Sequence, residues 1–403
     1  MVMVMEQGLS SQSRLILTGL GALLVSAVVL SAAGIYLGSV SEVLELIPGL
    51  MVLLPSIIHI RGSIAGVFAS RLSSSMHLGE FSIDFEEGSV LGDNIRASFV
   101  ITILIAFVIG IFSYVGSRIF ESPVIAVTDL VLISVVTGIV AGAVVMGITL
   151  LIALASYRYG LDLDMIGAPT VTTSGDLVTL PILVLSATSI MFLPPWIRLV
   201  LGGVAIVFGL AAILYTWNRS VRIGAIVREN VFLLIPLSVI GTLAGLTYSL
   251  NLEALVTIAA FLILIPPFTG GLGSIGGILG SRLSTGMHTG ELSPSFLPER
   301  GVVHHFIISY LYTLILLPLL ALIAHGAAVL MGLNSPGLGM LVAISLAAGL
   351  VVMTLVNGVA YATASLSFRY GLDPDNFGIP VITSLIDLIG AAALVTMIGL
   401  LLQ

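Results

Sequence analysis

The sequence predicts an all-α integral membrane protein built from two repeats. Hydrophobic residues make up 58% of the 403 residues, and charged residues only 8%. Soluble domains carry roughly 25% charged residues, so this chain cannot cover a surface in water. Eleven apolar stretches are long enough to cross a bilayer, and two sequence motifs each occur twice. These three observations define the fold class.

Each predicted span needs about 20 apolar residues to cross roughly 30 Å of hydrocarbon. We expect the two spans that contain Pro and Gly, 43–69 and 254–280, to be broken helices. We expect the first span to be a retained helix and not a cleaved signal peptide, because no small-residue cleavage site follows it. The eleven spans are 15–39, 43–69, 97–120, 126–155, 170–192, 194–218, 229–250, 254–280, 304–331, 337–366 and 381–403.

The motifs reveal a tandem duplication. Residues 62–80 match residues 273–291 at 12 of 19 positions, and residues 157–177 match 368–388 at 11 of 21. Both matches have the same offset of 211 residues. Two separate motifs with one offset indicate a duplicated unit and not a shared composition.

The duplication divides the chain into two copies of five spans. We expect a cytoplasmic N-terminus over 1–14, a first repeat over 15–192, a connecting helix and cytoplasmic loop over 193–225, and a second repeat over 226–403. Five is an odd number, so the additional crossing at 194–218 is needed to insert both copies in the same orientation. The sequence thus predicts parallel repeats related by a pseudo-two-fold axis along the membrane normal.

Arginine placement predicts the orientation in the cell membrane. With the N-terminus in the cytoplasm and the C-terminus outside, eleven Arg residues fall on the inner side and two on the outer side. Positive charge favours cytoplasmic loops. The outer pair is Arg118 and Arg198; the inner set is Arg14, Arg61, Arg71, Arg96, Arg158, Arg219, Arg222, Arg228, Arg282, Arg300 and Arg369.

Composition and motifs exclude several classes of protein. The chain has no Cys, which excludes thiolate metal sites and disulfides. A net charge of −7 argues against nucleic-acid binding. We find no P-loop, G-x-S-x-G or H-E-x-x-H signature, so we expect no enzyme activity and no cofactor.

Two carboxylates stand out because they occupy equivalent positions within predicted spans. Asp176 and Asp387 each lie about six residues into the fifth span of their copy. A carboxylate at membrane depth is costly and typically faces a partner or a watery path. Two such charges close together are unfavourable unless a cation lies between them or one of them is protonated. The alternative is a structural role, with each Asp hydrogen-bonded to neighbouring hydroxyls.

The helix faces around these carboxylates carry oxygen ligands and no nitrogen or sulfur donors. Oxygen-only sites suit Mg²⁺ and Ca²⁺. The residues that share these faces by helical spacing are Thr172, Thr173 and Thr179 in the first copy, and Thr383, Ser384 and Gly390 in the second.

Two further sets of residues are candidates for the ion path. Ser63 and Ser274 follow Gly62 and Gly273 in the second span of each copy, where they could line a pore. A set of acidic residues precedes each fifth span and could concentrate cations at a cytoplasmic vestibule or equally cap the next helix. This set is Asp162, Asp164, Asp373 and Asp375. Asp129 has Met340 as its counterpart, so it is not a repeat feature.

At these residues the chain resembles the MgtE-type divalent-cation (magnesium) transporters, and most closely the solute carrier 41 family, in which two such membrane domains are fused. The stretches that carry the resemblance are PSIIHIRGSIAGVFASRLSSS, PPFTGGLGSIGGILGSRLSTG, DLDMIGAPTVTTSGDLVTL and DPDNFGIPVITSLIDL. The resemblance implies a pore between the second and fifth helices of the two halves, with Asp176 and Asp387 at its ion site.

The chain departs from the family in three respects. Gly-Ser stands where many members have Gly-Asn, and Leu163 stands where the second copy has Pro374. MgtE-type bacterial proteins carry large cytosolic regulatory domains, whereas only about 14 residues precede the first span here, so we expect no gating by such a domain. One chain supplies both halves and suffices for one pore, although it could still form a homodimer.

The expected function is transmembrane transport of divalent cations, with Mg²⁺ ahead of Mn²⁺, Co²⁺ and others. A Na⁺-coupled Mg²⁺ exchanger is the first alternative. A carrier of small organic solutes is less favoured because we expect no Arg at membrane depth. A scaffold without transport would have no need of paired intramembrane Asp residues.

Overall fold

The computed structural model describes residues 2–77, 79, 81–86, 88–159, 163–217, 222–295, 297–370 and 374–402. Within these residues the only regular structure is helical. Ten helices are long and apolar enough to cross a membrane, and α6 adds the shorter apolar stretch Gly175–Met191. The predicted all-α membrane fold with eleven long helices is therefore confirmed.

The helices are α1 (Val2–Ser39), α2 (Ser41–Leu46), α3 (Leu50–His77), α4 (Val90–Ile119), α5 (Val127–Tyr159), α6 (Leu163–Met191), α7 (Pro195–Trp217), α8 (Arg222–Leu250), α9 (Leu252–Thr257), α10 (Ala260–His288), α11 (Arg300–Leu330), α12 (Leu338–Arg369) and α13 (Pro374–Leu401). Shifted by the 211-residue offset, α2–α6 coincide with α9–α13 to within about one residue at every end. The duplication is thus visible in the elements themselves.

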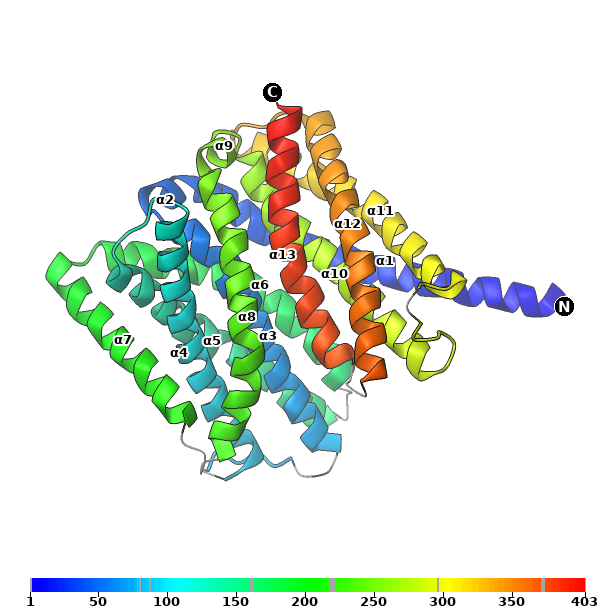
Figure 1. Ribbon diagram of the computed structural model, residues 1–403, viewed down its shortest axis with the longest axis horizontal. Helices are drawn as coiled ribbons and strands as arrows, with labels where there is room; N and C mark the ends of the chain where they lie inside the picture. Colours follow the sequence, from blue (N-terminus) through cyan, green and yellow to red (C-terminus); the bar gives the residue numbers. More distant parts are fainter. Residues whose placement is uncertain are drawn as a thin grey trace. The chain divides into compact units, whose positions relative to one another are not determined.

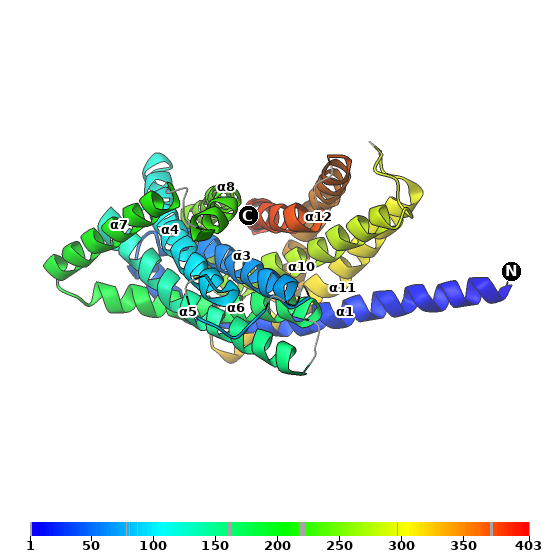
Figure 2. The same cartoon turned by 90° about the horizontal axis from the view of Figure 1, so that it is seen from below.

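The helices form two compact units that do not coincide with the two sequence copies. The terminal unit comprises Met1–Ser39 and Ala254–Gln403, and the central unit comprises Val40–Glu253. Helix α1 packs against α10 and α11 of the second copy, whereas α8 packs against α3 and α4 of the first (Figures 1 and 2). The first helix of each sequence copy therefore packs in the unit that contains the remaining helices of the other copy.

Equivalent glycines hold the exchanged helices in both units. Gly34 of α1 lies so close to α10 that a Cβ would overlap the carbonyl oxygen of Ile263, and Gly245 of α8 has the same relation to Val52 of α3. Both pairs obey the 211-residue offset. Pro267 has no N–H to donate to Ile263, so this carbonyl is free to face α1. The absence of a side chain at each glycine permits the approach.

We expect Gly34→Ala and Gly245→Ala each to lower the stability of the protein in detergent. The added methyl meets a backbone carbonyl that cannot rotate away, and overpacking of this kind costs about 1–3 kcal/mol. Thermal unfolding of the purified variants measures the loss. Gly21→Ala in α1 is the matched control, because a Cβ there meets nothing within 4 Å. A control that loses as much stability as Gly34→Ala would contradict the packing argument.

The helix breaks lie elsewhere than the sequence suggested. Helix α3 runs unbroken through Pro55, and α10 through Pro266 and Pro267. The expectation that these prolines break the spans is wrong, although both spans are interrupted, between α2 and α3 and between α9 and α10. The interruption lies before α3, at Pro48 and Gly49, where Gly49 has a φ of +93° that suits glycine. A membrane helix tolerates an internal Pro when neighbouring helices cover the freed carbonyl.

Helix α7 is the additional crossing between the copies and packs on α4 and α5 (Figure 1). An ion pair joins it to α5, with Arg198 Nη1 3.1 Å from Asp129 Oδ2. Large apolar side chains such as Trp196, Val207 and Leu214 are exposed on its other side. Such a surface suits contact with lipid, and the ion pair explains why Asp129 has no counterpart in the second copy.

Candidate ion pathway

Asp176 and Asp387 lie near the midpoints of α6 and α13, and both are half-buried. The two helices begin earlier than predicted, so the carboxylates lie farther from the helix ends than the six residues expected from sequence. Each carboxylate therefore lies well within its helix and not at an end. A carboxylate at such a place in a membrane-spanning helix is costly and is a candidate functional group.

In the terminal unit, the Asp387 side of α13 faces α10. Thr383 Cγ2 is 3.7 Å from the position of a Cβ on Gly273, and a Cβ on Gly390 would lie 3.4 Å from Thr269 Cγ2. Residues three and four apart share a helix face. Asp387 follows Thr383 by four residues and precedes Gly390 by three, so it lies on the face of α13 that meets α10.

In the central unit, α6 and α3 meet at the equivalent place. The Cα of Gly62 is 4.0 Å from the position of a Cβ on Gly175, the residue before Asp176. Thr179 is fully buried and its hydroxyl donates to the carbonyl of Gly175 at 2.6 Å. The second and fifth helices of each copy thus come together at the residues that the sequence singled out.

The candidate serines are half-buried, and their hydroxyls are bonded within their own helices. Ser63 Oγ donates to His59 O at 3.2 Å, and Ser274 Oγ donates to Gly270 O at 2.9 Å. Ser274 Oγ also lies 3.4 Å from Ser26 Oγ of α1. A hydroxyl that donates to a carbonyl keeps lone pairs that can accept, so these serines retain oxygen ligands.

On α13, Thr383 Oγ1 donates to Pro380 O at 3.2 Å and Ser384 is buried. Other candidates lie outside the described part of the chain: the side chains of Asp164, Thr172, Thr173 and Asp375, and the whole of Asp162 and Asp373. Among the described residues, no group of three or more His, Asp or Glu side chains converges in a way that could hold a metal ion.

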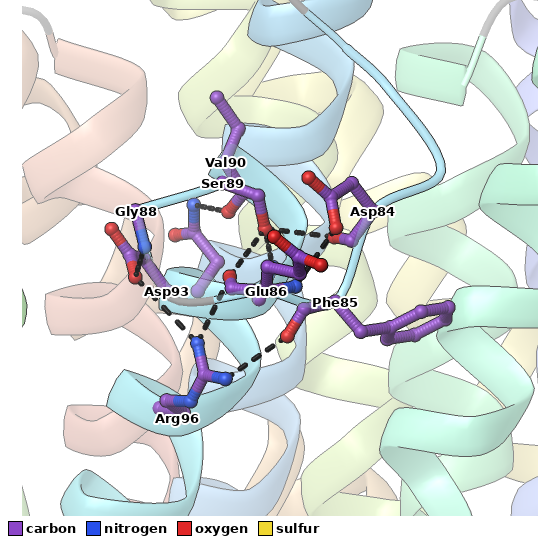
Figure 3. Close-up of polar contacts among 10 residues, drawn as sticks. Asp84, Phe85, Glu86, Gly88, Ser89, Val90, Asp93 and Arg96 are labelled. Carbon is purple, nitrogen blue, oxygen red and sulfur yellow. Dashed lines mark hydrogen bonds and ion pairs between the residues drawn. The ribbon is translucent and has the colours of Figure 1, made fainter.

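The charged side chains near the start of α4 form hydrogen bonds with the loop that precedes this helix (Figure 3). Ser89 caps α4 by accepting from Gly92 N at 3.0 Å. Asp93 accepts from Gly88 N at 3.0 Å, and Arg96 donates to Glu86 O at 3.1 Å. N-capping by Ser is worth about 1 kcal/mol. The buried carboxylate of Asp93 is therefore occupied in closing this loop.

One charge lies where the sequence analysis did not expect it. The arginine pattern predicts Arg61 on the cytoplasmic side, but Arg61 lies within α3 and only 4% of its surface is exposed. The expectation that no Arg lies within a membrane span is therefore wrong. It no longer argues against a carrier of small organic solutes. The signal was present in the sequence, because Arg61 falls inside the span predicted at 43–69.

These observations define a multi-pass membrane protein made of two equivalent helix sets, each with a carboxylate near the middle of its fifth helix. The chain belongs to the MgtE family of divalent cation transporters, which it matches twice, over residues 54–186 and 265–397. The two matches are again 211 residues apart. Each copy therefore matches the family separately.

The similarity to known relatives extends over most of this chain. Solute carrier family 41 member 3 of Mus musculus is 26% identical over 92% of this chain and 79% of its own length. Solute carrier family 41 member 2 of Homo sapiens is 22% identical over 88% of this chain and 64% of its own length. No solved structure matches the chain.

Proposed function

We propose that this protein carries Mg²⁺ across the cell membrane along a path lined by the second and fifth helices of each copy. These helices are α3, α6, α10 and α13. Asp176 and Asp387 are the ion-binding carboxylates in this proposal, and the threonine and serine oxygens beside them are further ligands. The proposal that the two carboxylates serve one ion rests on the repeat, which gives the fifth helix of each copy an Asp at the equivalent position.

One observation carries the proposal: a family of divalent cation transporters matches both copies, and both matches contain an Asp at mid-depth of the fifth helix. Neither a scaffold nor a carrier of apolar solutes needs a duplicated carboxylate in the bilayer. Mg²⁺ dehydrates reluctantly and binds through one or two carboxylates while it keeps several waters. Two Asp residues with hydroxyls nearby fit such a partly hydrated ion.

The proposal extends to topology and stoichiometry. We expect a cytoplasmic N-terminus, an external C-terminus, and one pore per chain, because each chain supplies both halves. The predicted repeat boundaries, at 15–192 and 226–403, describe the sequence copies between which the first helices are exchanged.

The test is Mg²⁺ flux into proteoliposomes that contain a Mg²⁺-sensitive dye. We expect flux above that of empty vesicles without any Na⁺ gradient if the protein conducts like a channel. A flux that requires an opposed Na⁺ gradient would favour the exchanger. The absence of flux under both conditions would contradict the proposal and favour the organic-solute or scaffold alternatives.

Asp162→Asn should weaken Mg²⁺ flux without abolishing it. If this carboxylate attracts cations at the cytoplasmic mouth, the loss should be largest at low ionic strength, because salt screens exposed charges beyond about 10 Å at 0.1 M. Flux measured between low and high KCl checks this, with Asp373→Asn as the equivalent variant of the second copy. A loss that is independent of salt would point to helix capping instead.

A further inference from the structure

The two copies differ in a buried positive charge on the second long helix of each copy. Arg61 on α3 is 4% exposed, whereas its repeat equivalent on α10 is Leu272, which is fully buried. The guanidinium of Arg remains protonated in proteins. The first copy therefore holds a positive charge at membrane depth, and the second copy has an apolar side chain at the same place.

The central unit is built to accommodate this side chain. Arg61 Nη1 donates to Thr102 Oγ1 of α4 at 3.3 Å. On α5, a Cβ on Gly142 would overlap Nη1, and a Cβ on Gly138 would lie 3.5 Å from Nη2. The second copy has Met353 in place of Gly142. An Arg–Gly pair in one copy thus replaces a Leu–Met pair in the other. The larger side chain at the first position is compensated by a smaller one at the second, as a close-packed interior requires.

The charge is incompletely satisfied. Arg61 Nε has no hydrogen-bond partner among the described residues. A cavity of about 10 Å³ adjoins the side chain and is lined by Ser98 and Thr102 with apolar neighbours, and no carboxylate is among its lining residues. It has room for about one water molecule. A buried charge within a membrane span that has no carboxylate partner in the adjoining cavity is by default a candidate functional group.

Arg61 is close to the proposed ion-binding carboxylate of its own unit. Gly62 follows Arg61, and Gly175 precedes Asp176; the position of a Cβ on Gly175 is 4.0 Å from Gly62 Cα. With 3.8 Å between consecutive Cα atoms, the Cα atoms of Arg61 and Asp176 are at most about 13 Å apart. This bound joins the two backbones, and the guanidinium itself lies against Thr102 of α4 and Gly142 of α5. In a medium of low dielectric constant, a unit charge still changes the affinity of a cation site over such distances.

We propose that Arg61 is a specificity residue that weakens cation binding in the half of the path formed by the first copy, so that the two halves hold the ion unequally. The inference rests on the proposed function. A fixed positive charge repels a divalent ion with twice the free energy that it exerts on a monovalent ion. Arg61 therefore keeps Asp176 from retaining Mg²⁺ too firmly for release.

The test transplants the residues of the second copy into the first. In Arg61→Leu/Gly142→Met, we expect the Mg²⁺ concentration for half-maximal flux to fall on the order of a hundredfold. The affinity of Na⁺, measured as a competitor of Mg²⁺ flux, should rise only on the order of tenfold. The maximal rate should fall because release becomes slow. A merely structural role of Arg61 would lower the yield and the rate without this dependence on ion charge.

Two single variants keep the test decisive if the double variant does not fold. Arg61→Lys retains the charge and should keep half-saturation close to that of the wild type. Arg61→Gln removes the charge, keeps a hydrogen-bond donor for Thr102, and should shift half-saturation in the same direction as the double variant. Wild-type half-saturation in Arg61→Gln, or an equal shift in Arg61→Lys, would overturn the inference. A wild type without Mg²⁺ flux would contradict the proposed function first, and the inference with it.

Discussion

Replacing Asp176 or Asp387 with Asn is expected to reduce Mg²⁺ flux to the level of empty vesicles. Asn has nearly the shape of Asp but no charge, and a neutral amide cannot offset the dehydration of a divalent ion. Because the two residues are repeat equivalents, each single variant should be inactive. Flux per reconstituted molecule, measured with a Mg²⁺-sensitive dye, checks the prediction.

The inactive variants should remain folded, since a carboxylate at membrane depth is costly and its removal is not expected to destabilise the helices. Elution on size exclusion and thermal unfolding in detergent establish this. Glu42→Gln is the matched control, because Glu42 is an exposed carboxylate on α2 and its loss should leave flux unchanged. Wild-type flux in Asp387→Asn would remove this residue from the mechanism.

Asp129→Asn should be the most destabilising of the conservative substitutions. Asp129 pairs with Arg198 at 3.1 Å, and their side chains are 11% and 17% exposed. Removal of one partner leaves a largely buried guanidinium uncompensated, which costs roughly 3–5 kcal/mol in fully buried pairs. Partial exposure places the expected loss toward the lower end. Thermal unfolding in detergent measures it, and flux per folded molecule should be unchanged.

Two comparisons isolate the ion pair. Asp129→Asn/Arg198→Gln should regain most of the lost stability, because the uncompensated charge is gone. Glu229→Gln breaks the pair of Arg71 and Glu229, which are 31% and 72% exposed, and should cost no more than about 1 kcal/mol. If the double variant is as unstable as Asp129→Asn alone, the ion pair is not what holds α7.

Much of the fold could be predicted because membrane helices carry strong, local signals. Length and apolarity identify each spanning helix, and the repeat at 211 residues fixes which helices correspond. The same repeat singled out Asp176 and Asp387, since symmetric carboxylates in apolar segments are improbable without a function. These signals reside in single segments and need no knowledge of packing.

Features that depend on contacts between distant segments could not be predicted. The exchange of α1 and α8 rests on Gly34 and Gly245 meeting carbonyls of helices far along the chain. The local sequence around a glycine in an apolar stretch does not reveal which helix the glycine packs against. The burial of Arg61 likewise depends on Gly142 of another helix, so its depth follows only when α3 and α5 are seen together.

Equilibrium binding of Mg²⁺ tests the central claim most directly, because it separates the ion site from the rate of transport. Isothermal titration of the purified protein in detergent with MgCl₂ should show saturable binding for the wild type and none for Asp176→Asn/Asp387→Asn. Binding in the double variant with wild-type affinity would contradict the claim that these two carboxylates hold the transported ion.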